Sequence, residues 1–376
     1  MKAKRPSANL SSAKHRAPRM RDVANRAGVG MMTVSRVLNG TAHVTDETSA
    51  RVYRALKELQ YQPNLMARAL RGHGSRSIGV IVPYLYDPFF ATCAHAISAV
   101  AKEHAYSVLL ATSDERADTE TEAARDLLRR QVEGIIVIPA CHGRSRLNTP
   151  EFHSIPMVAV DRPIARPIAR PGARPIARPL DRSVARPASP RIAHSRVDTV
   201  LVENQAGAAL ATEHLIEHGH KRICFIGLSQ KIYTMHARLT GYKKAMRSAG
   251  LKPQCFFNAA GEAATLNFLR SVLGRPNPPT AIFAANGLAS RDVLHAVAAL
   301  DIHIPEEIAF IGFDDFALAD ILRPALTVIR QPVQRAGQEA AQLLFSRLNG
   351  GASRPTQELN LPVELIIRRS CGCHPA

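Results

Sequence analysis

The sequence predicts two parts: a small all-α head of the helix-turn-helix type, and an α/β body built from two doubly wound parallel-sheet subdomains. Near the N-terminus, three short amphipathic helical patterns follow one another in a basic stretch. From Ile78 onward, short apolar runs alternate with helical patterns, which is typical of parallel sheets covered by helices. The chain has 376 residues, which is enough for two or three domains.

The net charge of +18 is concentrated in two segments. Residues 1–76 contain 15 Lys and Arg against 4 Asp and Glu, and residues 161–198 contain 9 Arg against 3 Asp. The rest of the chain is nearly neutral, with 25 basic and 24 acidic residues. At least one of the two basic segments is therefore expected to meet a polyanion.

Several classes of protein are excluded by composition. No apolar run reaches the roughly 18 residues of a membrane span, so we expect no membrane partner. The basic N-terminus lacks the apolar stretch of a secretory signal, which predicts a cytoplasmic protein. Six cysteines spread over so long a chain do not form a disulfide framework.

Three helices make up the predicted head, residues 19–63. The first carries an apolar stripe at helical spacing, formed by Met20, Val23, Ala24 and Ala27. A Gly-Val-Gly segment breaks it, a second helix follows over residues 31–38, and Thr45 is a good N-cap for the third. Residues 1–18 are polar and lack apolar periodicity, which predicts a disordered basic arm.

The second helix of the head has the composition of a DNA-reading helix. Its apolar side packs inward, which leaves the other side chains facing solvent or a groove: Met31, Met32, Thr33, Ser35 and Arg36. Hydroxyls suit phosphate contacts, and an Arg suits bidentate recognition of guanine. Two alternatives stay open. In one, the three helices form a packing module without DNA binding, and in the other, Met31 and Met32 pack partly against the helix bundle.

Throughout the body, short apolar runs alternate with amphipathic stretches. Seven apolar runs predict strands, at residues 78–83, 108–113, 134–139, 157–161, 223–227, 281–286 and 309–315. Seven amphipathic stretches predict helices, at residues 89–104, 118–130, 205–218, 238–249, 262–273, 288–300 and 333–348. This number of strands suits two subdomains rather than one.

Residues 162–190 interrupt the body with a low-complexity insert. Arg-Pro pairs recur every four residues from Arg162 to Pro179. Proline at this spacing forbids a helix interior or a central strand, so we expect an extended, solvated segment that lengthens a crossover between the subdomains. Either it is an extra nonspecific DNA arm, or it is a disordered loop that the fold tolerates.

Motifs along residues 20–371 resemble the lactose-repressor (LacI/GalR) family of bacterial transcription regulators. In the head they are Arg21-Asp22-Val23-Ala24, Thr33-Val34-Ser35-Arg36-Val37-Leu38-Asn39, Tyr61-Gln62-Pro63-Asn64 and Ala67-Arg68-Ala69-Leu70. In the body they include IGVIVP, VAVDR, RLTGY, GFDD, LTVIRQP and IIRRSC. The head departs at its start, where Pro18-Arg19 stand in place of the family's usual capping Thr.

The resemblance implies a homodimeric repressor that binds a pseudo-palindromic double-stranded operator. The implied DNA contacts are Met31, Met32, Thr33, Ser35, Arg36, Asn39, Asn64, Ala67 and Leu70. Residues 64–76 would be a linker whose first part, 64–72, forms a hinge helix on DNA, with Leu70 wedged into the minor groove. The alternative is an ordinary linker.

The resemblance also implies that residues 77–376 bind a small effector, a sugar or sugar acid, and dimerise. The implied effector residues are Phe89, Phe90, Asp161, Arg238, Asn286, Asp314 and Gln331. Most follow predicted strands, where doubly wound sheets bind ligands, and Arg238 is expected to open a helix. Phe89 as a core residue and Asp314 as a residue that only orients its own loop stay open. The family's usual Asn-Asp is Asn286-Gly287 here, so this loop loses a carboxylate.

Other chemistry finds little support, so we expect no enzyme, no cofactor and no metal. The dinucleotide, P-loop, zincin and nucleophile-elbow motifs do not occur. Cys371-Gly372-Cys373-His374 lacks a second pair of ligands and predicts a frayed terminus, while His214 and His218 predict a solvated helix face. The rival function is a solute-binding protein of the same two-lobed fold without specific DNA binding.

Overall fold

The computed structural model describes residues 18–39, 44–61, 74–140, 145–164, 197–257, 261–350 and 355–373. The chain divides into two compact units, residues 1–75 and residues 76–376, called here the head and the body. In the described part of the chain, no helix has both the length and the apolar character needed to cross a membrane.

The head is a three-helix cluster around a small apolar core. Its helices are α1 (Met20–Ala27), α2 (Met31–Asn39) and α3 (Asp46–Glu58). Val23, Val34 and Val52, one from each helix, are fully buried. Gly28 ends α1 with a φ of 65°, a left-handed conformation that favours glycine.

At the first turns of α1 and α3, a side chain accepts a hydrogen bond from a backbone N–H. The Thr45 hydroxyl caps α3 by accepting a hydrogen bond from the Thr48 N–H. At α1, the Asp22 carboxylate accepts a hydrogen bond from the Arg19 N–H at 2.7 Å. This bond is half of a capping box, and it offsets part of the loss of the family's capping Thr.

The body contains two six-stranded sheets, each covered by helices. Lobe A has the strand order β11-β5-β4-β3-β1-β2, with every pair parallel. Its strands are β1 (Ser77–Val82), β2 (Ser107–Thr112), β3 (Gly134–Val137), β4 (Met157–Val160), β5 (Asp198–Val202) and β11 (Glu358–Leu361). The prediction of doubly wound parallel sheets is confirmed.

Lobe B has the order β12-β10-β9-β8-β6-β7, parallel except for the β10–β12 pair. Its strands are β6 (Ile223–Gly227), β7 (Gln254–Phe257), β8 (Ala281–Ala284), β9 (Ala309–Phe313), β10 (Thr327–Arg330) and β12 (Glu364–Ile366). Lobe B therefore repeats the architecture of lobe A, with one antiparallel edge strand.

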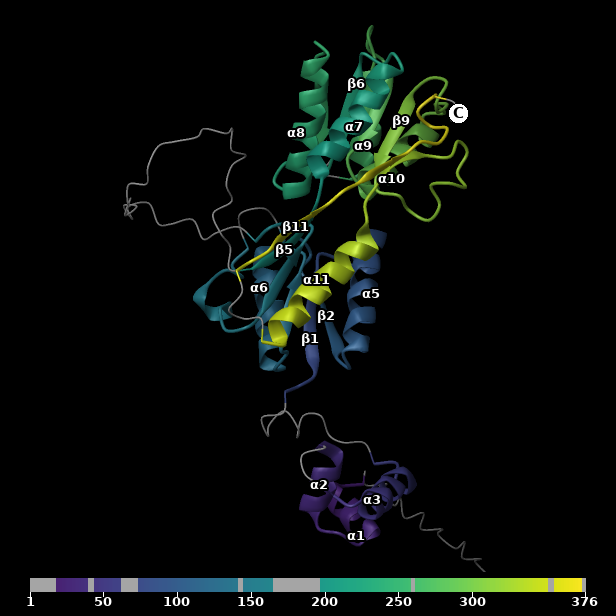
Figure 1. Cartoon of the computed structure of the whole chain (residues 1–376). Helices are drawn as coiled ribbons and strands as arrows, with labels where there is room; N and C mark the ends of the chain where they lie inside the picture. The colour runs from purple at the N-terminus through teal and green to yellow at the C-terminus, as the bar shows by residue number, and fades with distance from the viewer. Residues whose placement is uncertain are drawn as a thin grey trace, which may run out of the picture. The chain divides into compact units, whose positions relative to one another are not determined.

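Helices lie on both faces of each sheet (Figure 1). Lobe A carries α5 (Pro88–Glu103), α6 (Ala117–Arg129), α11 (Val333–Leu348) and the short η1 (Pro150–Phe152). Lobe B carries α7 (Asn204–Glu217), α8 (Tyr233–Ser248), α9 (Glu262–Leu273) and α10 (Gly287–Ala299). Successive strand residues point to opposite faces of the sheet and so belong to different cores. Val80 packs with α5 and α11, and Ile81 packs with α6.

The chain passes between the lobes three times, from β5 to α7, from β10 to α11 and from β11 to β12. Each passage is only a few residues long. Residues at the carboxyl ends of the strands in both sheets therefore come together where the lobes meet, and this is the region in which doubly wound folds bind ligands.

Four details of the sequence prediction are wrong. The strands β5, β7, β10, β11 and β12 were not predicted, and Arg238 lies inside α8 rather than at its start. The insert joins β4 to β5, which pair in parallel within lobe A, so it does not lengthen a passage between the lobes. Its first residue, Arg162, is buried rather than solvated.

Much of the insert, residues 165–190, lies outside the described residues. So do residues 1–17 of the predicted basic arm and residues 62–73, which contain most of the predicted hinge. The domain boundaries placed there stay predictions.

Candidate DNA interface and inter-lobe cleft

Helix α2 presents the predicted reading residues to solvent. Met31 is 54% exposed and Met32 is 71% exposed, so neither methionine is buried in the bundle. Arg36 is exposed, and Thr33 and Ser35 are half-buried. An exposed apolar pair beside an arginine is a surface suited to contact with base edges.

The remaining predicted DNA contacts cannot be placed. Asn39 closes α2, but its side chain is not among the described parts of the chain, and the same holds for the whole of Asn64, Ala67 and Leu70.

All seven predicted effector residues line a single cavity where the lobes meet. Lobe A contributes Phe89, Phe90 and Asp161, and the others are Arg238, Asn286, Asp314 and Gln331. The cavity has a volume of about 30 Å³, roughly the space of one water molecule. Sequence reasoning missed five polar or aromatic residues that also line it: Tyr84, Asp87, Glu115, Arg162 and Thr234.

The strand ends explain this convergence. Asp161 follows β4 and Asp314 follows β9, both with a positive φ (67° and 86°) that turns the chain sharply out of the sheet. Asn286 follows β8, and its side-chain oxygen accepts a hydrogen bond from the Ala289 N–H at 3.1 Å. Helix α10 is therefore capped despite the departure from the family pattern at position 287.

Arg162 is the centre of a buried ion cluster in lobe A. Its guanidinium lies 2.7 Å from the Glu115 carboxylate and 3.0 Å from the Asp161 carboxylate, and it donates a third hydrogen bond to the Pro139 carbonyl oxygen at 3.2 Å. The Arg162 side chain is 6% exposed. Burial raises the pKa of Asp161, and Arg162 and Arg238 oppose that rise.

Arg238 is a second buried cation, 3% exposed, on α8. It donates to the Asn204 side-chain oxygen and to the Ala285 carbonyl oxygen, both at 2.7 Å. Its guanidinium carbon lies 3.6 Å from the centroid of the Phe313 ring, a cation–π contact. These contacts fix the direction of Arg238 before any ligand arrives.

Asp314 links three segments of lobe B. Its carboxylate accepts hydrogen bonds from the Gly287 N–H at 2.9 Å and from the Gln331 side-chain amide. Asp314 thus orients more than its own loop. The side-chain oxygen of Gln331 is buried and has no hydrogen-bond partner among the described residues, which leaves an acceptor at the cavity.

The cleft contains more carboxylate groups than guanidinium groups. Four carboxylates (Asp87, Glu115, Asp161, Asp314) line the cavity with two guanidinium groups (Arg162, Arg238). Carboxylates accept hydrogen bonds, and a ligand that donates several of them, as hydroxyl groups do, fits this set.

Asp87 should make the stability of the body depend on pH. Burial, and next the nearby Asp314 carboxylate, raise the pKa of Asp87 to about 6. Since the folded state then holds this proton more tightly than the unfolded chain, the residue costs stability increasingly from about pH 4 to pH 6, and the cost is constant above that range. Asp87→Asn keeps an acceptor for the Phe89 N–H and should add up to about 3 kcal/mol at pH 7.

Urea unfolding at pH 4 and at pH 7 measures this effect. The gain in the free energy of unfolding should appear at pH 7 and vanish at pH 4. An equal gain at both values would mean that the ionisation of Asp87 is not its source.

Comparisons with known proteins find matches for both parts of the chain. Residues 19–64 match the model for bacterial regulatory proteins of the lacI family, and residues 212–371 match the periplasmic binding protein-like domain. The HTH-type transcriptional repressor PurR of Pasteurella multocida is 30% identical over 358 residues, which cover 93% of this chain and 98% of that protein. The ribose operon repressor of Halalkalibacterium halodurans is 29% identical, covering 93% and 96%.

Among solved structures, the Lac repressor dimer bound to operator and the anti-inducer ONPF is similar in fold. The TM-score is 0.77 at 23% sequence identity, and the match covers 95% of this chain and 99% of that one.

Proposed function

Because the chain belongs to the LacI family of bacterial regulatory proteins and is a DNA-binding, metabolite-controlled transcriptional repressor, we propose that its effector is a neutral monosaccharide bound between the lobes. The observation that carries this proposal is the cavity itself, where four carboxylates and the unpartnered Gln331 oxygen converge. In this proposal the cleft residues bind the sugar and catalyse no reaction.

A neutral sugar fits the cleft better than a sugar acid. Sugar hydroxyls donate to the carboxylates of Asp161 and Asp314, and the Gln331 oxygen accepts one more. The carboxylate of a sugar acid would meet the same acidic side chains, and the two guanidinium groups already have hydrogen-bond acceptors within the protein. The name of the Halalkalibacterium relative, a ribose operon repressor, supports the same class of ligand.

Ligand cavities in proteins usually have roughly 300 Å³ or more, so a sugar does not fit the cavity of about 30 Å³ as it stands. A larger cavity of about 1070 Å³ shares Asp87, Phe89, Asp314 and Gln331 with it, and in this proposal the lobes move so that the two form one binding site. A sugar that binds the open form more tightly shifts the population toward it. We propose that this shift, acting through the three passages between the lobes, changes how the two hinge segments of a homodimer meet the operator.

For DNA, we propose that Arg36 reads a guanine and that Met31 and Met32 contact thymine methyl groups. Their exposure on α2 supports this assignment. Leu70 is proposed as the wedge at the operator centre, and a homodimer would place two heads on a pseudo-palindromic site. The remaining contacts in this proposal are Thr33, Ser35, Asn39, Asn64 and Ala67.

Operator binding with and without sugar tests the proposal. Genomic fragments that bind the protein should contain a palindromic site, and ribose or a related neutral sugar should change the affinity for that site at least about fivefold. The same sugar should raise the melting temperature, whereas gluconate should not. Leu70→Ala should weaken operator binding and leave the sugar-induced thermal shift intact.

The outcomes separate the alternatives. Featureless recovery of DNA together with a sugar-induced thermal shift would favour a solute-binding protein. A thermal shift with gluconate alone would contradict the neutral-sugar assignment, and unchanged operator affinity of Leu70→Ala would remove the wedge.

A further inference from the structure

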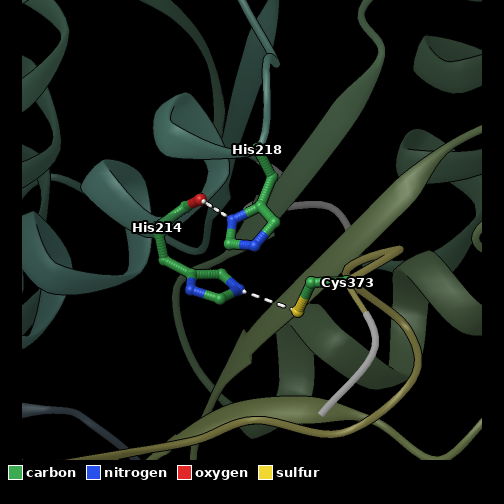
Figure 2. Close-up of side chains that lie close together, drawn as sticks. All are labelled: His214, His218 and Cys373. Atoms are coloured by element: carbon green, nitrogen blue, oxygen red, sulfur yellow. Dashed lines mark hydrogen bonds between the residues drawn. The ribbon is translucent and has the colours of Figure 1, made fainter. Parts of the chain in front are cut away.

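Two segments far apart in the sequence bring four potential metal ligands together in lobe B. Helix α7 contributes His214 and, directly after its last residue, His218, and the C-terminal segment contributes Cys371 and Cys373. Figure 2 shows His214 Nε2 facing the Cys373 sulfur, at 3.3 Å. The ligand atoms of His214, His218 and Cys373 all lie within 4.8 Å of one another. The Cys371 sulfur is not part of that close group, but it lies 2.7 Å from the Cys373 sulfur.

The histidine pair is preset for coordination. His214 and His218 are four residues apart, so their rings share one face of α7, with centroids 4.3 Å apart. His218 Nδ1 donates to the His214 carbonyl oxygen at 2.7 Å (Figure 2), which leaves its Nε2 lone pair available. A hydrogen bond of this kind on the far ring nitrogen is the usual support of a metal-binding histidine.

The cysteine pair is held just as firmly. The neighbouring Ser370 ties the tail to lobe B: its hydroxyl donates to the Phe310 carbonyl oxygen at 2.7 Å and accepts from the Thr327 N–H at 2.8 Å. Gly372, with a φ of 79°, provides the turn that brings both sulfurs to one side. The Thr327 hydroxyl lies 3.2 Å from the Cys371 sulfur.

The sequence expectations are wrong for His214, Cys371 and Cys373, whereas His218 is exposed as expected. His214 is 6% exposed rather than solvated, and Cys371 and Cys373 are 1% and 9% exposed rather than frayed. Cys371 and Cys373 have no second pair of ligands near them in the sequence, but His214 and His218 supply that pair in the fold.

We propose that His214, His218, Cys371 and Cys373 form a tetrahedral site for Zn²⁺. Two sulfurs and two imidazole nitrogens are a ligand set typical of this ion. Zn–S bonds of about 2.3 Å and Zn–N bonds of about 2.0 Å place neighbouring S and N atoms about 3.5 Å apart in a tetrahedron, close to the 3.3 Å between Cys373 and His214. The sulfurs must separate by about 1 Å, which the single turn between them allows.

The site is accessible to the ion. Cys373 and Gly372 line an open cavity of about 970 Å³, and His218 is exposed. Zinc would fasten the C-terminal segment to α7. The first residue of that helix, Asn204, holds Arg238 in the effector cleft.

Metal binding to the reduced, tag-free full chain tests the proposal. After removal of metals, the protein should take up one Zn²⁺ in competition with a chromogenic chelator. Co²⁺ should give the intense visible bands of tetrahedral coordination together with a sulfur-to-metal charge-transfer band. His218→Gln changes an exposed side chain, so the fold should survive, and its Zn²⁺ affinity should fall more than about tenfold.

Cys371→Ser and Cys373→Ser should each abolish the charge-transfer band or halve its intensity. Cys255→Ser and His236→Gln, with residues outside the cluster, should bind as the unmodified chain does. Zn²⁺ affinity that is unchanged in His218→Gln and in both serine variants, or Co²⁺ spectra without sulfur coordination, would overturn the proposal. So would a Cys371–Cys373 disulfide that persists under the reducing conditions.

Discussion

Replacing Arg162 with methionine should lower the free energy of unfolding of the body by about 3–5 kcal/mol at pH 7. The substitution removes the only guanidinium bonded to both Glu115 and Asp161 among the described residues and leaves two carboxylates in a closed cavity. Methionine keeps much of the apolar volume, so the loss is that of the charge. Urea unfolding followed by circular dichroism measures it.

Two comparisons distinguish this charge effect from a general sensitivity to arginine loss. Arg125→Met removes an exposed pair with Glu151 and should cost less than about 1 kcal/mol. Adding Glu115→Gln to Arg162→Met should recover part of the stability, since one uncompensated charge disappears. Lowering the pH should also reduce the difference in the free energy of unfolding between the unmodified chain and Arg162→Met, because the carboxyl groups left without a cation then take up protons. Equal losses for Arg162→Met and Arg125→Met would contradict the role of the cluster.

The effector residues were predictable because strand ends are visible in a sequence. Asp161 and Asp314 each stand directly after a short apolar run, and parallel strands bring such positions to one edge. The head was predictable for a similar reason. Apolar spacing and the cap Thr45 define its helices from local information alone.

What escaped prediction depends on long-range partners. Arg162 is the first residue of the Arg-Pro repeats, so the sequence suggests that it is solvated like the rest of them. It is buried because it pairs with Glu115, which lies 47 residues earlier in the chain. The short apolar run of β5 was overlooked beside the repeats, and its place in the sheet is set by its pairing with β4 and β11. The His214–Cys373 contact spans 159 residues, so each half looked like surface or tail when considered alone.

Gly241→Ala should destabilise the body by about 3 kcal/mol or more, although alanine is the better helix former by up to about 1 kcal/mol. Gly241, the glycine of the RLTGY motif, lies where α8 crosses α7, and an added Cβ would lie 2.1 Å from the Gln205 carbonyl oxygen. That oxygen belongs to the backbone of α7 and cannot rotate away, so the helices must separate.

Separation of α7 from α8 would also lengthen the 2.7 Å hydrogen bond between Asn204 and Arg238, so sugar affinity should fall together with stability. Gly274→Ala is the matched control, since its Cβ would lie 3.5 Å from the nearest such atom, and it should be nearly neutral. Thermal unfolding with and without sugar measures both effects. Equal stability of the two alanine variants would show that α7 and α8 can adjust to the methyl group, and the close approach would then not explain the glycine.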